Sequence, residues 1–268
     1  MMLALGNVHL APLLREMKKI ALDQSSDHEF NVEHGRGSWS HADGWGLAYL
    51  QQGEWVVEKS LQPFFSDPRI EQEPFRMIQT TAALIHVRKK AGSGLALENT
   101  HPFIVRTETL GEVVFCHNGC IEDEISFSPE FRPQGQTDSE KWLYAILTEL
   151  KGSTMVKAIR ENFRRLRNFT GTNIILAGEK KFYAGMSQNR YPRYYQLLLG
   201  QRKDLLVVSS ERLDSLPGMT WTTLTEGDVV EIDHRTRQYT IHAAERRELM
   251  EPLYVESAKG PARALYPC

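Results

Sequence analysis

The chain has 268 residues, of which 41% are hydrophobic and 25% are charged, a composition typical of a folded globular protein. Its 32 Lys and Arg residues and 34 Asp and Glu residues give a formal net charge of −2. This near-balance argues against a nucleic-acid-binding protein, which would be basic, and the composition as a whole argues against a disordered chain, which would be rich in charge and poor in apolar residues. The sequence has no apolar stretch near the roughly 20 residues that span a bilayer, no basic start typical of a signal peptide, and too few cysteines for a disulfide framework. We therefore expect a cytoplasmic protein with neither nucleic-acid nor membrane partners.

Apolar residues recur with helical spacing in several parts of the chain. The predicted helices are residues 10–22, 68–78, 139–150 and 155–166. The clearest is 139–150, which follows Thr137 and Glu140, a pair with the spacing of a capping box. Short runs of β-branched and aromatic residues between turn residues predict strands. These strands are residues 45–50, 55–59, 82–88, 113–117, 173–177, 181–185, 195–199, 205–209, 229–232 and 239–242.

Many short strands with few helices predict an α+β fold with mostly antiparallel sheets. No linker rich in Pro, Gly or Ser divides the chain, so residues 1–268 are predicted to form one domain. Residues 23–42 and 91–102 are predicted to be long loops, and loops of this length in compact domains are often functional.

Polar residues cluster where predicted strands end or where the clearest helix begins. Each has a structural explanation: Asn118-Gly119 is a common hairpin dipeptide, Asp138 can cap a helix, and Arg88 can be a surface charge. The histidines of these segments can be core imidazoles. The segments are HADGWG (41–46), HVR (86–88), ENTHPF (98–103), FCHNGC (115–120) and GQTDSE (135–140).

Taken together, these residues supply what a site for an amino-acid amide needs. The planar fork of Arg88 can bind both oxygens of a carboxylate, and Asp138 can pair with an α-ammonium group. The side-chain amide of Asn118 and a backbone N–H can form an oxyanion hole. The combination indicates acyl transfer from an amino-acid amide.

In order and spacing, these segments resemble the class II glutamine amidotransferases of the stand-alone type, which are N-terminal nucleophile hydrolases. The resemblance extends over nearly the whole chain, since SSE (209–211) and GDVV (227–230) look like the closing strands of that family. It implies a four-layer αββα sandwich and hydrolysis of the side-chain amide of glutamine or a γ-glutamyl compound, without a cofactor. A separate ammonia-accepting synthase would be the partner, unless the reaction is simple hydrolysis.

The resemblance also implies roles for individual residues. Arg88 would hold the substrate α-carboxylate and Asp138 its α-ammonium group. The Asn118 amide and the Gly119 N–H would form the oxyanion hole, and His101 would shape the wall of the glutamine pocket. Supporting positions in the same segments are His41, Asp43, His86 and His117.

The sequence departs from the family at the nucleophile, which in the family is a cysteine exposed by removal of the initiator Met. This chain begins MMLALG and has no cysteine before Cys116, and a methionine thioether cannot form an acyl-enzyme. In one interpretation Met2 stands in the nucleophile position, and the protein is an inactive relative that binds glutamine or another amino acid. In the other, the printed chain starts too late, and a Met-Cys-Arg start precedes Met1. We favour the late start, because the other substrate-contacting positions carry the residues that the chemistry needs; as printed, the chain is predicted to be inactive.

Two further hypotheses use internal residues. Cys116 or Cys120 could be a nucleophile, but it would need a base within reach, and His117 is the only neighbour in sequence; both fit better as small packing residues. The histidines at 86, 101 and 117 could hold a metal ion in a metal-dependent hydrolase. Since the two cysteines lack the second ligand pair of a zinc finger, we expect no metal.

Overall fold

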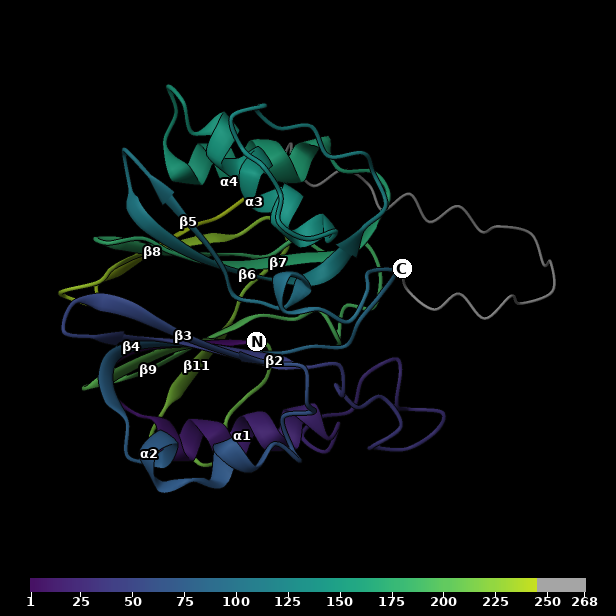
Figure 1. Ribbon diagram of the computed structural model, residues 1–268, viewed down its shortest axis with the longest axis vertical. Coiled ribbons are helices and arrows are strands. Elements are labelled where there is room, and N and C mark those ends of the chain that lie inside the picture. The colour runs from purple at the N-terminus through teal and green to yellow at the C-terminus, as the bar shows by residue number, and fades with distance from the viewer. Residues whose placement is uncertain (245–268) are drawn as a thin grey trace.

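The computed structural model describes residues 1–244. Within this range two antiparallel sheets lie face to face, and helices cover their outer faces (Figure 1). The first sheet contains, in spatial order, β11 (Thr220–Thr223), β9 (Leu198–Arg202), β10 (Leu205–Ser209), β1 (Met2–His9), β4 (Gln79–Val87), β2 (Trp45–Gln51) and β3 (Glu54–Ser60). The second contains β13 (Tyr239–His242), β12 (Val229–Asp233), β8 (Lys181–Gly185), β7 (Phe169–Ala177), β6 (Gly111–Ile121) and β5 (Phe103–Thr107).

The helices form the two outer layers of the sandwich. The first sheet is covered by α1 (Leu10–Ala21) and α2 (Glu73–Arg76), and the second by α3 (Asp138–Glu149) and α4 (Met155–Arg165) (Figure 1). Short 3-10 helices occur at Pro68–Glu71 and Leu97–Asn99. The α+β class and the αββα layering expected from the sequence are confirmed.

Three apolar layers hold the sandwich together, and β1 contributes to two of them because successive side chains of a strand point to opposite faces. Leu3 and Leu5 lie between the two sheets. Met2 and Ala4 pack on the other face, in the layer that the first sheet shares with α1. The third layer lies between the second sheet and the helices α3 and α4.

Strand β1 was not predicted, although it is central to its sheet and pairs with both β4 and β10. Residues 2–5 are buried on both faces, so they lack the alternation of apolar and polar residues that marks a half-buried strand. Strands β5 and β11 were also missed.

Two predicted elements differ from the structure in extent. The predicted helix at 68–78 is divided into a 3-10 turn and the single-turn α2, because Pro74 fits the first turn of a helix but not its interior. The predicted strand at 195–199 begins only at Leu198, since Tyr195 N–H instead closes a turn onto the carbonyl of Tyr191.

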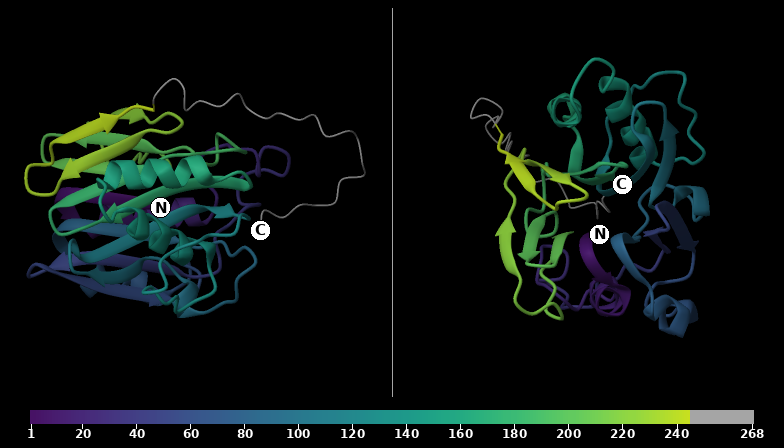
Figure 2. Two further views of the ribbon diagram at one scale, coloured as in Figure 1. Left: turned by 90° about the horizontal axis from the view of Figure 1, so that it is seen from above. Right: turned by 90° about the vertical axis from the view of Figure 1, so that its left-hand side faces the viewer.

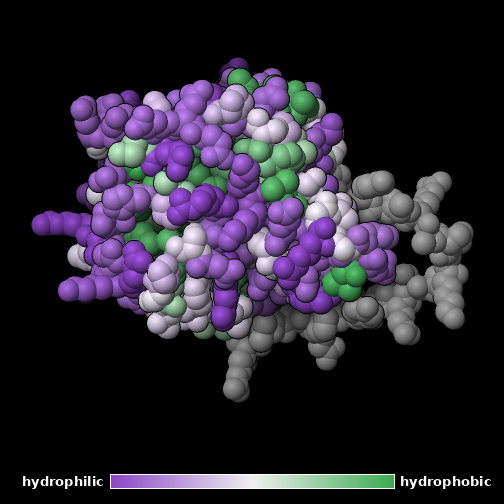
Figure 3. All heavy atoms as spheres, turned by 90° about the horizontal axis from the view of Figure 1, so that it is seen from below, coloured by the Kyte–Doolittle hydropathy of each residue, from purple (hydrophilic) through white to green (hydrophobic). Residues whose placement is uncertain are grey.

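The fold brings the start of β1, the ends of β4 and β6 and the start of α3 to one end of the sandwich, and the N-terminus lies between the sheets (Figure 2). The face seen in Figure 3, which includes the α1 layer, is mostly hydrophilic with small separate hydrophobic groups. Among residues 1–244, no helix is long and apolar enough to cross a membrane.

Candidate active site

A cavity of about 80 Å³ at this end of the sandwich brings together the predicted site residues. Arg88 follows β4, Asn118 and Gly119 lie near the end of β6, and Asp138 begins α3; all of them line the cavity. The predicted histidines line it as well, namely His41, His86, His101 and His117. Side chains predicted from separate sequence segments therefore share one enclosed space.

Arg88 is a buried cation, with 4% of its surface exposed. Its guanidinium donates to Ser93 Oγ at 2.9 Å, to the Gly94 carbonyl at 3.1 Å and to the Asp43 carbonyl at 3.4 Å. Burial lowers the pKa of Arg88, but a guanidinium stays charged in proteins. Within residues 1–244 no carboxylate forms an ion pair with it, so a substrate carboxylate can supply the missing counter-ion.

Asp43 supports this arrangement from outside the cavity. Its carboxylate accepts a hydrogen bond from the Lys90 N–H at 2.9 Å, while its own N–H donates to the Arg88 carbonyl at 3.0 Å. These contacts fix the chain that carries Arg88, so the structure places Asp43 behind the guanidinium rather than at the substrate.

Asp138 is the first residue of α3, and Thr137 caps this helix by accepting from the Glu140 N–H at 3.2 Å. The Asp138 carboxylate accepts from the N–H groups of Ile121 and Ser139, each at 2.8 Å. These bonds tie the start of α3 to the end of β6 and orient the carboxylate. An ionised carboxylate has acceptor capacity beyond two bonds, which leaves Asp138 able to bind an α-ammonium group.

The Asn118-Gly119 pair is not the hairpin turn that its sequence suggests. Strand β6 continues through it, with Asn118 opposite Asn173 and Gly119 opposite Thr172, and becomes irregular only before Ile121. A Cβ atom on Gly119 would lie 1.6 Å from the carbonyl oxygen of Gly171. Gly119 is therefore required by the close approach of the neighbouring strand, and the pair sits at the cavity edge.

The histidines form a neutral wall. His117 accepts from the Ser139 hydroxyl at Nδ1 (2.9 Å) and donates from Nε2 to the Gly171 carbonyl (3.4 Å), the tautomer that satisfies both partners. His86 donates to the His117 carbonyl at 3.2 Å. The rings of His86 and His101 are in contact, with centroids 4.2 Å apart and a tilt of 38° between their planes. No cluster of His, Cys, Asp and Glu within residues 1–244 could hold a metal ion.

His101 stands out because neither of its ring nitrogens has a hydrogen-bond partner, although the residue is 6% exposed. Burial, reinforced by the neighbouring His86 and His117, holds its pKa well below the usual range, so the ring is neutral. Buried polar atoms without partners are uncommon. His101 therefore has a donor and an acceptor available to a ligand in the cavity.

Met1, rather than Met2, lies near Asn118, one of the two residues predicted to form an oxyanion hole. Met1 lines a cavity of about 20 Å³ together with Asn118, and its α-amino group donates to the Ser210 hydroxyl at 3.2 Å. Burial lowers the pKa of this α-amino group. The side chain of Met2 packs on the opposite face of β1 against α1, so Met1, one position earlier, is the residue of this strand that lies near Asn118.

Two residues at the site were not singled out from the sequence. Tyr194 donates its hydroxyl to His41 Nε2 at 3.2 Å, while His41 Nδ1 donates to the Val87 carbonyl at 3.3 Å. Burial lowers the pKa of His41 to about 4 and raises that of Tyr194. Ser210 holds the N-terminus. Both residues come from the last third of the chain, and only the aromatic run YPRYY (191–195) gave a signal.

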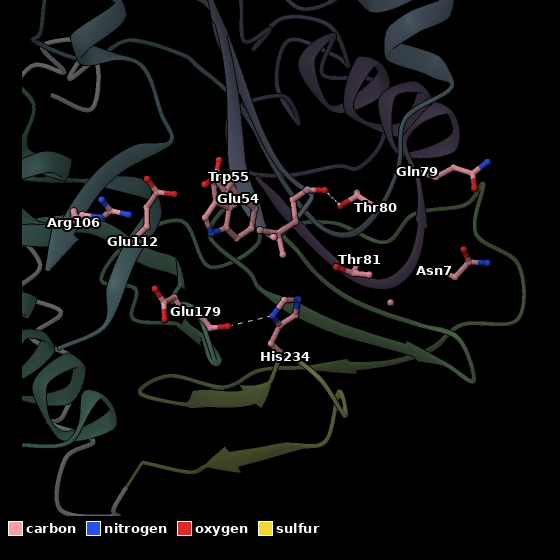
Figure 4. A pocket seen from close by; sticks show the side chains of 14 residues that line it. Asn7, Glu54, Trp55, Gln79, Thr80, Thr81, Arg106, Glu112, Glu179 and His234 are labelled. Atoms are coloured by element: carbon pink, nitrogen blue, oxygen red, sulfur yellow. Dashed lines mark hydrogen bonds between the residues drawn. The ribbon is translucent and has the colours of Figure 1, made fainter. Parts of the chain in front are cut away.

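A larger cavity, of about 730 Å³, lies at the opposite end of the sandwich (Figure 4). It is lined by the starts of β4 and β6 and by turn residues such as Glu179, whose carbonyl is hydrogen-bonded to His234. None of the predicted site residues faces it. We therefore take the smaller cavity around Arg88 as the candidate active site.

Comparison with known proteins places the site in a family. The model of the class II glutamine amidotransferases matches residues 18–189. The chain belongs to this family. The match includes Arg88, Asn118 and Asp138 and every other residue that lines the cavity except Tyr194.

Individual relatives are similar to this chain over part of their length. YafJ of Escherichia coli K12, which carries the provisional name of glutamine amidotransferase, is 35% identical over 123 residues, which cover 44% of this chain and 48% of YafJ. The uncharacterised protein MJ1515 of Methanocaldococcus jannaschii is 29% identical over 117 residues, which cover 42% of this chain and 32% of MJ1515. The match thus spans about half or less of the length of these relatives.

Solved structures share the fold at low sequence identity. Glutamine phosphoribosylpyrophosphate amidotransferase from B. subtilis superposes with a TM-score of 0.59 at 17% identity, covering 90% of this chain and 48% of that one. The predicted glutamine amidotransferase of Pseudomonas aeruginosa PA01 superposes with a TM-score of 0.55 at 17% identity, covering 91% and 99%. The likeness supports the N-terminal nucleophile hydrolase fold.

Proposed function

We propose that the cavity around Arg88 binds glutamine or a γ-glutamyl compound and is built to cleave its side-chain amide. Arg88 holds the α-carboxylate of the substrate, and Asp138 holds its α-ammonium group. His101 contacts the carbon chain of the substrate. The observation that carries the proposal is the buried Arg88 guanidinium, which has no carboxylate partner within residues 1–244 and shares its cavity with Asp138 and the Asn118-Gly119 pair.

The Asn118-Gly119 pair suits the chemical step. When a nucleophile attacks the amide carbon, negative charge develops on the carbonyl oxygen, and the Asn118 side-chain amide and Gly119 N–H are the donors assigned to it. Such donors stabilise the transition state more than the bound substrate, by about 3–4 kcal/mol each in well-studied enzymes. Hydrolysis then releases glutamate and an amine, which for glutamine is ammonia that a separate synthase can consume.

The nucleophile belongs at the N-terminal end of β1, where Met1 lies beside Asn118. The thioether of Met1 cannot form an acyl-enzyme. Cys116 is no substitute, because it is buried between the sheets, and burial raises the pKa of its thiol far above the usual range. We propose that cleavage uses a cysteine at this end of β1, as in the family, and that the sequence as printed binds substrate without cleaving it.

A second candidate function is a non-catalytic glutamine-binding module. The observation that favours it is the position of Met1, whose side chain occupies the wall beside the oxyanion pair. Binding without turnover in every form of the protein would support this candidate, because its pocket has the same groups for the α-carboxylate and the α-ammonium.

The test compares chains that differ only at their start. One chain begins at Met1, one carries Met-Cys-Arg ahead of Met1, and one carries cysteine in place of Met1 behind a removable initiator Met. Calorimetry with L-glutamine measures binding, and glutamate release measures turnover. We expect all chains to bind and a cysteine-bearing chain to release glutamate, with Asn118→Ala abolishing most of that release. Failure of every chain to bind glutamine would contradict the proposal, and binding with no release in either cysteine-bearing chain would favour the module.

A further inference from the structure

A second cavity, of about 470 Å³, adjoins the glutamine cavity. Asn118 and Gly119 line both spaces, so the proposed oxyanion pair lies where the two cavities meet. The same boundary also contains Lys89, Lys90, Ala91, Ser93 and Tyr194. The second cavity contains neither Arg88 nor Asp138. Its other lining residues include aromatic and lysine side chains, namely Trp39, Lys89, Lys90, Tyr194 and Tyr195.

The bound substrate has two ends, the glutamyl end and the group on its amide nitrogen, and the second cavity lies near only one of them. If Arg88 and Asp138 hold the glutamyl end and the carbonyl rests at Asn118 and Gly119, the group on the amide nitrogen lies beyond this pair. The second cavity meets the glutamine cavity at this pair and lacks both Arg88 and Asp138, so it is the space open to the leaving amine. Free glutamine would place only an NH₂ group there. A water molecule takes up about 30 Å³, far less than the 470 Å³ of the second cavity. The cavity thus has room for a substantial leaving amine.

The lysines give this space a positive charge. Lys89 Nζ donates to the Ser40 carbonyl at 3.1 Å and lies 4.2 Å from the centre of the Trp39 ring. The Lys90 side chain is exposed. Within residues 1–244 neither lysine forms an ion pair with an Asp or Glu side chain, although Asp43 accepts a hydrogen bond from the Lys90 backbone. The Lys89 ammonium over the Trp39 ring and the exposed Lys90 ammonium, neither of them in such an ion pair, suit an anionic group carried by the leaving amine.

We propose that the substrate is a γ-glutamyl amide whose leaving amine bears an anionic group, bound by Lys89 and Lys90 in the second cavity. This inference rests on the proposed function and narrows its substrate class. The net reaction is hydrolysis: the C–N bond of the γ-amide breaks, the acyl carbon takes the hydroxyl of water, and the amine nitrogen takes its proton. The products are glutamate and an amine that keeps its anionic group.

The test measures binding of matched ligands by calorimetry at low ionic strength. γ-L-Glutamylglycine has an anionic leaving amine, γ-L-glutamylglycinamide is its neutral counterpart, and L-glutamine has no substituent. We expect γ-glutamylglycine to bind about fivefold more tightly than the glycinamide, equal to about 1 kcal/mol, the upper range for partly exposed charge pairs. Lys90→Glu should remove this preference, so that γ-glutamylglycine and the glycinamide bind with equal affinity. Lys180→Glu, an exposed lysine in the turn between β7 and β8, is the control of equal charge change and should keep the preference.

The outcomes separate this inference from the proposed function. Equal binding of all three ligands, lost in Arg88→Ala, would overturn the inference while supporting the glutamine site. A preference for γ-glutamylglycine that survives both Lys90→Glu and Lys89→Gln would also overturn it, since the lysines would then contribute nothing. Failure of all three ligands to bind the unmodified protein would overturn the proposed function as well.

Discussion

Replacing Arg88 by methionine should separate substrate binding from folding. The guanidinium is 4% exposed, and a buried cation without an ion-pair partner is costly to keep folded. Its three hydrogen bonds go to Ser93, Gly94 and the Asp43 carbonyl, groups that are at least partly exposed and that water can therefore satisfy in the variant. Methionine fills much of the same volume without a charge.

The expected effects on the two properties differ. Removing one partner of a buried charge pair costs about 2–5 kcal/mol of binding free energy, so Arg88→Met should weaken glutamine binding by at least about 30-fold. The free energy of unfolding should change by no more than about 1 kcal/mol, because the lost hydrogen bonds are offset by the relief of the unpaired charge.

Calorimetry with L-glutamine and urea unfolding, run on the same preparations, measure both quantities. Ser93→Ala is the control, since it removes one loop hydrogen bond of Arg88 and leaves the guanidinium in place; it should bind glutamine within about threefold of the unmodified protein, a difference of under 1 kcal/mol. Binding by Arg88→Met within that same range would refute the assignment of Arg88 to the substrate carboxylate. A large loss of stability would refute the view that its charge is uncompensated in the free protein.

Further predictions concern the oxyanion pair and the wall of the site. Gly119→Ala should lower the free energy of unfolding by more than about 2 kcal/mol, because its Cβ would lie 1.6 Å from the Gly171 carbonyl oxygen; an unchanged urea midpoint would contradict this. In a cysteine-bearing chain, Asn118→Ala should lower kcat by about 100- to 1000-fold with little change in KM; an equal loss of binding in calorimetry would indicate a folding role instead. Burial lowers the pKa of His41 from its usual 6.5 to about 4, so as the pH falls the unfolded chain is protonated at His41 before the folded chain is. Stability should therefore be complete above pH 6.5 and fall as the pH drops toward 4, by up to about 3 kcal/mol, and urea titrations of His41→Gln should show a shallower fall.

Much of the fold was predictable because local patterns and tertiary packing agree. Helix α3 begins at Asp138 behind the Thr137 cap and buries the stripe that its spacing predicts. Strand β1 was not predictable in the same way: its two faces enter two different apolar layers, so no alternation marks it. The sequence of the Asn118-Gly119 pair suggests a hairpin turn, but the pair is extended. Its path is imposed by pairing with β7, which is more than 50 residues away in the sequence.

The candidate site also contains some residues that the sequence indicates and others that it does not. Arg88, Asp138 and the Asn118-Gly119 pair were singled out from the sequence because each residue type has a direct chemical role with an amino-acid amide, and the structure brings them to one cavity. Tyr194 and Ser210 were not, because their roles depend on contacts with His41 and the N-terminus across the whole sandwich. A hydroxyl that positions another group carries no signal of its own in a single sequence.

A crystal structure of the chain beginning at Met1 with bound L-glutamine tests the central claim most directly, since this form is expected to bind without cleaving. The α-carboxylate should lie on the Arg88 guanidinium, the α-ammonium group at the Asp138 carboxylate, and the side-chain carbonyl at Asn118 and Gly119. Glutamine bound in the reverse orientation, or only in the large cavity near Glu179 and His234, would contradict the claim that this cavity is a glutamine-amide site.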